Sequence, residues 1–92
     1  MFIFEVLDAP DLGRAVRRLR KERGWTQVEL AEWLDVNPVT VGRMEHGRPV
    51  AITVAMRALT LLGAKAVVVP KWASVGVPGE EPPRAGEEPP RG

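Results

Sequence analysis

Two helix starts lie close together in the segment Thr26–Glu45, TQVELAEWLDVNPVTVGRME. Thr26 carries the hydroxyl of an N-cap residue, and Glu29 three positions later completes a capping pair. Asn37 offers a second capping side chain, and Pro38 after it fits the first turn of a helix. This spacing leaves room for one short helix, a tight turn and a second short helix. The segment therefore predicts a helix-turn-helix.

The apolar pattern of the segment supports this interpretation. Small or apolar residues fall where two crossing helices share a core, and these are Leu30, Ala31, Leu34, Val36, Val41 and Met44. A helix pair of this kind packs its first helix against the domain and leaves one face of the second free for a DNA major groove. We expect that free face to carry Val39, Thr40 and Arg43.

The longer segment GWTQVELAEWLDVNPVTVGRMEHGR resembles the helix-turn-helix of the lambdoid phage repressor and Cro family, also called the XRE family. Asp35 stands where the family turn usually has glycine at positive φ, a geometry that Asp tolerates better than most residues. The matching positions are Thr26-Gln27, Leu30-Ala31, Val36, Val41, Met44-Glu45 and Gly47.

This resemblance implies a mainly α fold, a four-helix lambda-repressor-like domain over residues 1–72. Capping residues, helical spacing and glycines at helix ends predict the helix bounds. We expect Trp25 to pack back on Leu30, and Glu45 to pair with Arg20 or Arg23 rather than face phosphate. The expected helices are 9–23, 27–34, 38–45 and one that carries Ala55, Ala58, Leu59 and Leu62 and stops at Gly63.

Two apolar runs outside these helices are too short for helices and predict strands. One is the N-terminal segment Phe2–Leu7, and the other is Ala66–Pro70 with its three valines. The second strand has three candidate pairings: with residues 2–6 of the same chain, with its own copy in a second subunit, or with both. A strand after the helical core is similar to DNA-binding antitoxins of the HipB type, in which it pairs across a homodimer. That resemblance assigns a dimer interface to Val67, Val68 and Val69.

Residues 73–92 show no periodicity and contain GEEPPR twice. A segment so rich in Pro, Gly and Glu lacks the apolar residues needed to fold alone, so we expect a disordered tail of polyproline character. The alternative function for it is docking to a partner. The tail also separates the charges: residues 1–73 hold 11 Lys/Arg and 8 Asp/Glu, a net charge of +3, whereas residues 74–92 hold 2 and 4, a net charge of −2.

Composition excludes several classes of site. The 92 residues include no Cys and one His, so disulfides, thiolate metal sites and histidine clusters are ruled out. The sequence also lacks a nucleophile–base pair and a phosphate loop, and we expect no enzyme activity, no cofactor and no metal. No apolar stretch approaches the roughly 20 residues that span a bilayer, and no signal-peptide pattern is present, so a cytoplasmic location without a membrane partner is expected.

The resemblance also implies contacts with a double-stranded DNA operator. Gln27, at a helix start, is expected on a phosphate. Arg43 can hold the O6 and N7 acceptors of guanine, Val39 can contact a thymine methyl, and Pro38 offers only apolar contact. His46 also fits an ordinary exposed residue. It is nevertheless among four further residues expected on the DNA backbone or on flanking bases, which are Asn37, Thr40, His46 and Arg48.

Three functions fit these features. The first is a sequence-specific transcriptional repressor that binds a palindromic operator as a dimer, specifically a HipB-like antitoxin, with a HipA-like toxin kinase as a possible partner. The second is a stand-alone phage-type regulator. The third is an adaptor that uses the same scaffold for protein contact. Trp33 bears on the choice, because an aromatic residue on that side of its helix is either covered within the chain or part of a partner interface.

Overall fold

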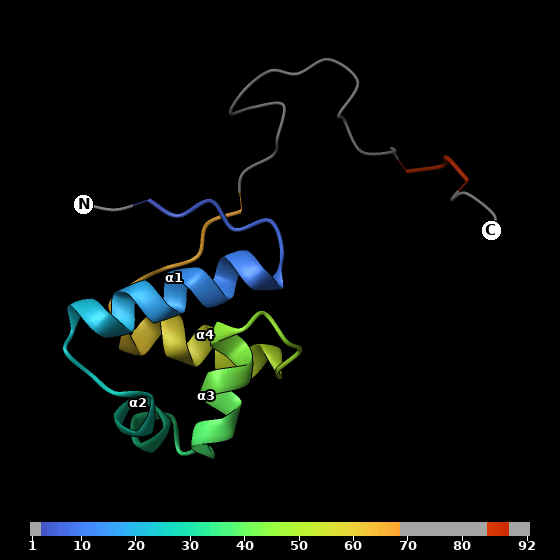
Figure 1. The fold of residues 1–92 in the computed structure, drawn as a ribbon. Coiled ribbons are helices and arrows are strands. Elements are labelled where there is room, and N and C mark those ends of the chain that lie inside the picture. Colours follow the sequence, from blue (N-terminus) through green and yellow to red (C-terminus); the bar gives the residue numbers. More distant parts are fainter. Residues whose placement is uncertain (1–2, 69–84, 89–92) are drawn as a thin grey trace.

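A computed structural model describes residues 3–68 and 85–88 of the chain. All four expected helices are present. In Figure 1, α2 and α3 lie together beneath α1, with α4 behind them. Two of the predicted ranges are matched to the residue. The helices are α1 (Ala9–Glu22), α2 (Gln27–Leu34), α3 (Pro38–Glu45) and α4 (Ile52–Leu61).

Helix α1 begins and ends at residues suited to those positions. The Asp8 side chain accepts a hydrogen bond from the backbone N–H of Asp11, and Pro10 lies in the first turn. At the other end Arg23 is the C-cap, one residue after the last helical position, and Gly24 follows at φ 74°. The predicted range ended at Arg23 and so was one residue too long.

The connection between α2 and α3 confirms the capping pattern. Thr26 and Glu29 form a reciprocal capping box at the start of α2. Asp35 ends α2 in the left-handed region, at φ 56° and ψ 47°, as expected from its place in the turn. The Asn37 side chain then accepts from the backbone N–H of Val39 and starts α3. Two helices are thereby joined by a turn that fixes their relative orientation.

The core lies between the four helices. It is formed by side chains from each of them, and its fully buried members include Val16, Leu30, Leu34, Val41 and Met44. Trp25 is half-buried and packs against this cluster, in agreement with the expected packing of Trp25 on the start of α2.

A glycine in α1 permits a close crossing that the sequence did not reveal. A Cβ on Gly13 would lie 2.4 Å from the carbonyl oxygen of Met44 and 2.7 Å from that of Glu45. The end of α3 therefore contacts the backbone of α1 directly. This contact holds α3 against α1 and fixes which of its faces remains open.

The expected strands are not confirmed. Residues 3–7 and 64–68 have no regular secondary structure, and no backbone hydrogen bond joins these two segments within the described part of the chain. Pairing of the two segments within one chain, one of the alternatives considered, is therefore not observed among these residues, and pairing across a dimer stays a prediction. Phe2 and residues 69–70 lie outside the described residues, as does most of the expected tail.

Candidate nucleic-acid interface

Helix α3 has one buried face and one open face. Val41, Met44 and Glu45 are buried against the domain. On the other side Val39 is 58% exposed, and Arg43 is exposed with no hydrogen bond or ion pair among the described residues. The hypothesis that Val39 and Arg43 point outward therefore agrees with the geometry. Arg43 presents an unoccupied guanidinium at the centre of this face.

Other predicted contact residues surround this open face. Asn37, Pro38, His46 and Arg48 are exposed, while Thr40 is half-buried. The Asn37 side-chain oxygen is already engaged in capping α3, where it accepts from Val39 N–H at 2.9 Å. All five residues belong to α3 or to its two flanking turns, so the fold gathers them around one helix.

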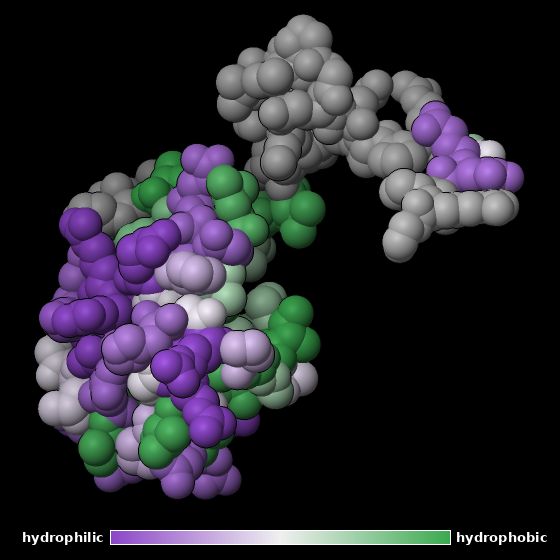
Figure 2. Space-filling view, turned by 45° about the vertical axis from the view of Figure 1, so that its right-hand side comes forward, coloured by the Kyte–Doolittle hydropathy of each residue, from purple (hydrophilic) through white to green (hydrophobic). Residues whose placement is uncertain are grey.

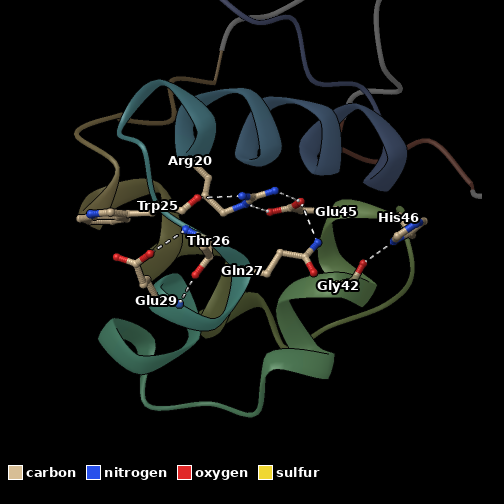
Figure 3. Close-up of polar contacts among 8 residues, drawn as sticks. All are labelled: Arg20, Trp25, Thr26, Gln27, Glu29, Gly42, Glu45 and His46. Atoms are coloured by element: carbon tan, nitrogen blue, oxygen red, sulfur yellow. Dashed lines mark hydrogen bonds and ion pairs between the residues drawn. The ribbon is translucent and has the colours of Figure 1, made fainter.

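His46 is held at the end of α3. Its Nδ1 lies 2.7 Å from the carbonyl oxygen of Gly42, and because a carbonyl only accepts, Nδ1 is the protonated nitrogen of this contact (Figure 3). The remaining ring nitrogen, Nε2, is then the one available to solvent or to a ligand. Gly47 follows at φ 74°, where a Cβ would lie 2.8 Å from Pro10, so a glycine is required at this turn.

Arg20 and Glu45, which are buried, and Gln27, which is half-buried, form a polar network behind the open face (Figure 3). Arg20 donates from Nε to Glu45 Oε2 at 2.7 Å and from Nη2 to Glu45 Oε1 at 3.0 Å. A third Arg20 donor, Nη1, reaches the carbonyl oxygen of Trp25 at 2.8 Å. Gln27 donates from Nε2 to Glu45 Oε1 at 3.1 Å. The expected pairing of Glu45 with Arg20 is therefore confirmed, and the Gln27 bond is an addition to it.

The network is electrostatically balanced. The side chains of Arg20 and Glu45 are only 10% and 2% exposed, so neither charge is strongly hydrated. The hydrogen bonds that Arg20 donates to the Glu45 carboxylate raise the pKa of Arg20 above its ordinary value, against the opposing effect of burial. Arg20 thus stays protonated and compensates the carboxylate, which keeps an anionic Glu45 compatible with a nearby anionic ligand.

The first turn of α2 also presents backbone donors. The Thr26 hydroxyl accepts from Glu29 N–H, which leaves the N–H groups of Gln27 and Val28 without an acceptor in the described part of the chain. Such groups form the positive end of the helix dipole. Gln27, half-buried at this turn, therefore places its amide and its side chain where an anion is favoured.

Cationic side chains extend along the exposed face of α1. Arg14 pairs with Asp11, and Arg18 with Glu22 at 3.2 Å. Together with Arg17 and Lys21 they line a shallow open groove. Hydrophilic side chains cover much of the surface turned to the viewer, and apolar ones gather toward one edge (Figure 2). The basic surface of α1 is thus partly neutralised by neighbouring carboxylates.

Trp33 is a candidate contact residue of another kind. It is 61% exposed and stacks on Trp25, with ring centroids 6.0 Å apart and planes 20° from parallel. Arg23 lies 5.8 Å from the centre of the Trp25 ring. Among the described residues Trp25 is the aromatic neighbour of Trp33, and most of the Trp33 surface is exposed.

The valines assigned to a dimer interface lie apart from α2 and α3. Val67 and Val68 are 70% and 96% exposed, on the segment that leaves α4 (Figure 1). Val69 is outside the described residues. Within the described ranges, no cluster of three or more His, Asp or Glu that could hold a metal ion occurs. Over the same residues, every helix is too short or too polar to cross a membrane.

Comparison with known proteins adds an independent observation. A family model described as a helix-turn-helix domain matches residues 11–72, which contain all of α2, α3 and α4. The chain is 38% identical over 56 residues to the HTH-type transcriptional regulator RamB of Mycobacterium tuberculosis, and these residues are 60% of the chain and 12% of RamB. It is 46% identical over 37 residues to the competence pilus inhibition repressor of Acinetobacter baylyi, or 40% of the chain and 34% of that repressor. The chain thus matches only a small part of either relative.

Proposed function

Because the chain belongs to the helix-turn-helix domain family, we propose that it binds double-stranded DNA and regulates transcription. The observation that carries this proposal is the open face of α3, on which Val39 and Arg43 are exposed opposite a buried core face. An α-helix with a free side of this kind fits the width of a major groove.

Base recognition is assigned to the centre of α3. Arg43 has all its donors available for the O6 and N7 acceptors of a guanine. Contact with a thymine methyl group is proposed for Val39, and apolar contact beside it for Pro38. Because this face has few hydrogen-bonding side chains, part of the sequence preference is assigned to DNA shape.

Backbone binding is assigned to the residues around α3. Gln27 and the free amides at the start of α2 approach one phosphate. Additional contacts come from the turns before and after α3. These are Asn37, Thr40, His46 and Arg48.

The proposal extends to repression through a palindromic operator by a homodimer, since two-fold sites match two recognition helices about 34 Å apart. Val67, Val68 and Val69 are proposed to join the two subunits, which would supply the strand partner that the described part of one chain lacks. The relatives are a transcriptional regulator and a repressor, which supports a role in transcription regulation. The HipB-like antitoxin with a HipA-like toxin kinase remains the narrower hypothesis, and it rests on sequence resemblance alone.

One observation favours a second candidate function. The exposed Trp33, stacked on Trp25, offers an aromatic surface of the kind enriched at protein interfaces. An adaptor that uses this scaffold for protein contact is therefore the alternative. It differs from the first proposal in requiring no affinity for duplex DNA.

Salt dependence of binding separates the two functions. A fluorescent duplex from the region upstream of the chain's own gene is titrated with the full chain at about 50 mM and about 200 mM salt. Release of counterions from DNA predicts a loss of affinity of at least about tenfold across this range. Absence of duplex binding at the lower salt concentration would reject DNA regulation and favour the adaptor.

A further inference from the structure

We propose that Glu45 is a positioning residue for DNA binding, acting through Gln27 rather than by contact with the duplex. The proposal rests on the proposed function, because it concerns how Gln27 is presented to a phosphate. Its basis is the hydrogen bond of 3.1 Å from Gln27 Nε2 to Glu45 Oε1, which links the first turn of α2 to the last turn of α3.

The chemistry of Glu45 fixes the orientation of the Gln27 carboxamide. An ionised carboxylate only accepts hydrogen bonds, so the NH2 end of Gln27 must face it. The carbonyl end then lies on the side of Gly42, where it is 3.9 Å from the position of a Cβ on that residue. One N–H then remains on Gln27 Nε2 for a second acceptor, and the proposal assigns it to a phosphate.

A neutral amide at position 45 would not select this orientation. It presents both a donor and an acceptor, so Gln27 could rotate its carboxamide by half a turn and direct its oxygen toward the phosphate. A carbonyl oxygen directed at a phosphate is repulsive. The carboxylate of Glu45 thus sets an orientation that the amide does not.

Arg20 makes this arrangement compatible with an anionic ligand. Glu45 is buried, and two Arg20 hydrogen bonds of 2.7 and 3.0 Å neutralise its charge from the α1 side. Without that neutralisation, a carboxylate one hydrogen bond away from the phosphate-binding residue would oppose DNA. The three residues therefore form a relay from α1 through α3 to the start of α2.

A double-mutant cycle tests the proposal. Affinity for duplex is measured for the parent, Gln27→Met, Glu45→Gln and the double variant, with unfolding measured for each. We expect each single variant to bind about fivefold to tenfold more weakly, as for loss of one hydrogen bond to a charged group. In the Gln27→Met background, Glu45→Gln should have no further effect. If the fold-loss of affinity in the double variant equals the product of the two single losses, the proposal is overturned and Glu45 is a purely structural residue.

Loss of stability requires its own control. Leu62→Ala removes a buried side chain of the core that takes no part in the Arg20–Glu45–Gln27 hydrogen bonds, and is expected to destabilise the domain without changing the affinity of the folded protein. If Leu62→Ala weakens binding as much as Glu45→Gln does, affinity follows stability and the proposal fails.

A second measurement applies to the unmodified chain, so it holds even where Glu45→Gln fails to fold. Nuclear magnetic resonance detects the coupling across the hydrogen bond between Gln27 Nε2 and the Glu45 carboxyl carbon. We expect this coupling both in the free protein and in the DNA complex. Its loss on DNA binding would show that Gln27 leaves Glu45 to reach the duplex, which contradicts a positioning role. If the parent binds no duplex at all, the proposed function fails first and this inference fails with it.

Discussion

Arg20 of α1 and Glu45 of α3 form a two-pronged ion pair in the interior, with contacts of 2.7 and 3.0 Å between residues 25 positions apart in the sequence. The pair lies beside the close crossing of α1 and α3 at Gly13 and adds a polar contact between these two helices. It joins the supporting helix of the domain to the helix whose other face is open.

Removing one partner of this pair should be much worse than removing both. Arg20→Met leaves Glu45 buried without its counter-charge, and we expect a loss of about 3–5 kcal/mol in the free energy of unfolding. The double variant Arg20→Met/Glu45→Leu should be more stable than either single variant, because no unpaired charge stays buried. Urea denaturation gives the free energy of unfolding of the parent, of Arg20→Met, of Glu45→Leu and of the double variant. Simple addition of the two single losses would contradict this account of the pair.

Two helical glycines should respond in opposite directions to alanine. A Cβ at Gly42 meets only Gln27 Oε1, at 3.9 Å, so Gly42→Ala should stabilise the domain by about 0.5–1 kcal/mol through helix propensity. A Cβ at Gly13 meets two backbone oxygens within 2.7 Å, so Gly13→Ala should destabilise it by about 1–3 kcal/mol. Thermal denaturation of both variants and of the parent measures the two changes in stability. Equal effects would show that the α1–α3 crossing is looser than described.

Asp35 should prefer replacement by glycine. It is the one described non-glycine residue at positive φ, at 56°, and left-handed backbone disfavours a Cβ. We expect Asp35→Gly to raise the free energy of unfolding by up to about 1 kcal/mol, and Asp35→Val to lower it, because a β-branched side chain is least tolerated there. Denaturant titration compares the two variants with the parent. A loss of stability in Asp35→Gly would mean that the carboxylate itself stabilises the turn.

The start of α1 should be sensitive to acid. The backbone N–H of Leu7 lowers the pKa of Asp11 below its ordinary 3.8, and Arg14 lowers it further. Since the pKa is lower in the folded than in the unfolded chain, the stabilisation is complete above the ordinary value and is lost as pH falls through the lowered one. The difference in melting temperature between the parent and Asp11→Asn should therefore be larger at about pH 7 than at about pH 2. A difference that does not change with pH would exclude this contribution.

Local signals in the sequence predicted most of the helical fold. Thr26, Asn37 and Pro38 marked helix starts because capping depends on neighbours in the chain. Gly63 likewise marked the end of α4, where its backbone lies at φ 77°. The bounds of α2 and α3 could therefore be predicted to the residue, and the outward direction of Arg43 followed from the helical period.

Contacts between distant residues were predicted less well. The strands depended on a partner that no local pattern specifies, and the described part of one chain supplies none. The approach of Gly13 to α3 and the bond from Gln27 to Glu45 depend on how α1, α2 and α3 cross. Trp33 was expected to be either covered within the chain or part of an interface, and its stacking on Trp25 could not be foreseen from helical spacing.

The most direct test concerns Arg43, the proposed base-reading residue at the centre of the open face of α3. Preferred duplexes are selected from a random library with the parent, with Arg43→Ala and, as a control, with Arg57→Ala on the exposed side of α4. Arg43→Ala should lose about 1–3 kcal/mol on the preferred site and lose its preference at one position per half-site, whereas Arg57→Ala should keep the parent preference. An equal loss of affinity on every sequence, or an unchanged preference in Arg43→Ala, would contradict the assignment of α3 as the recognition helix.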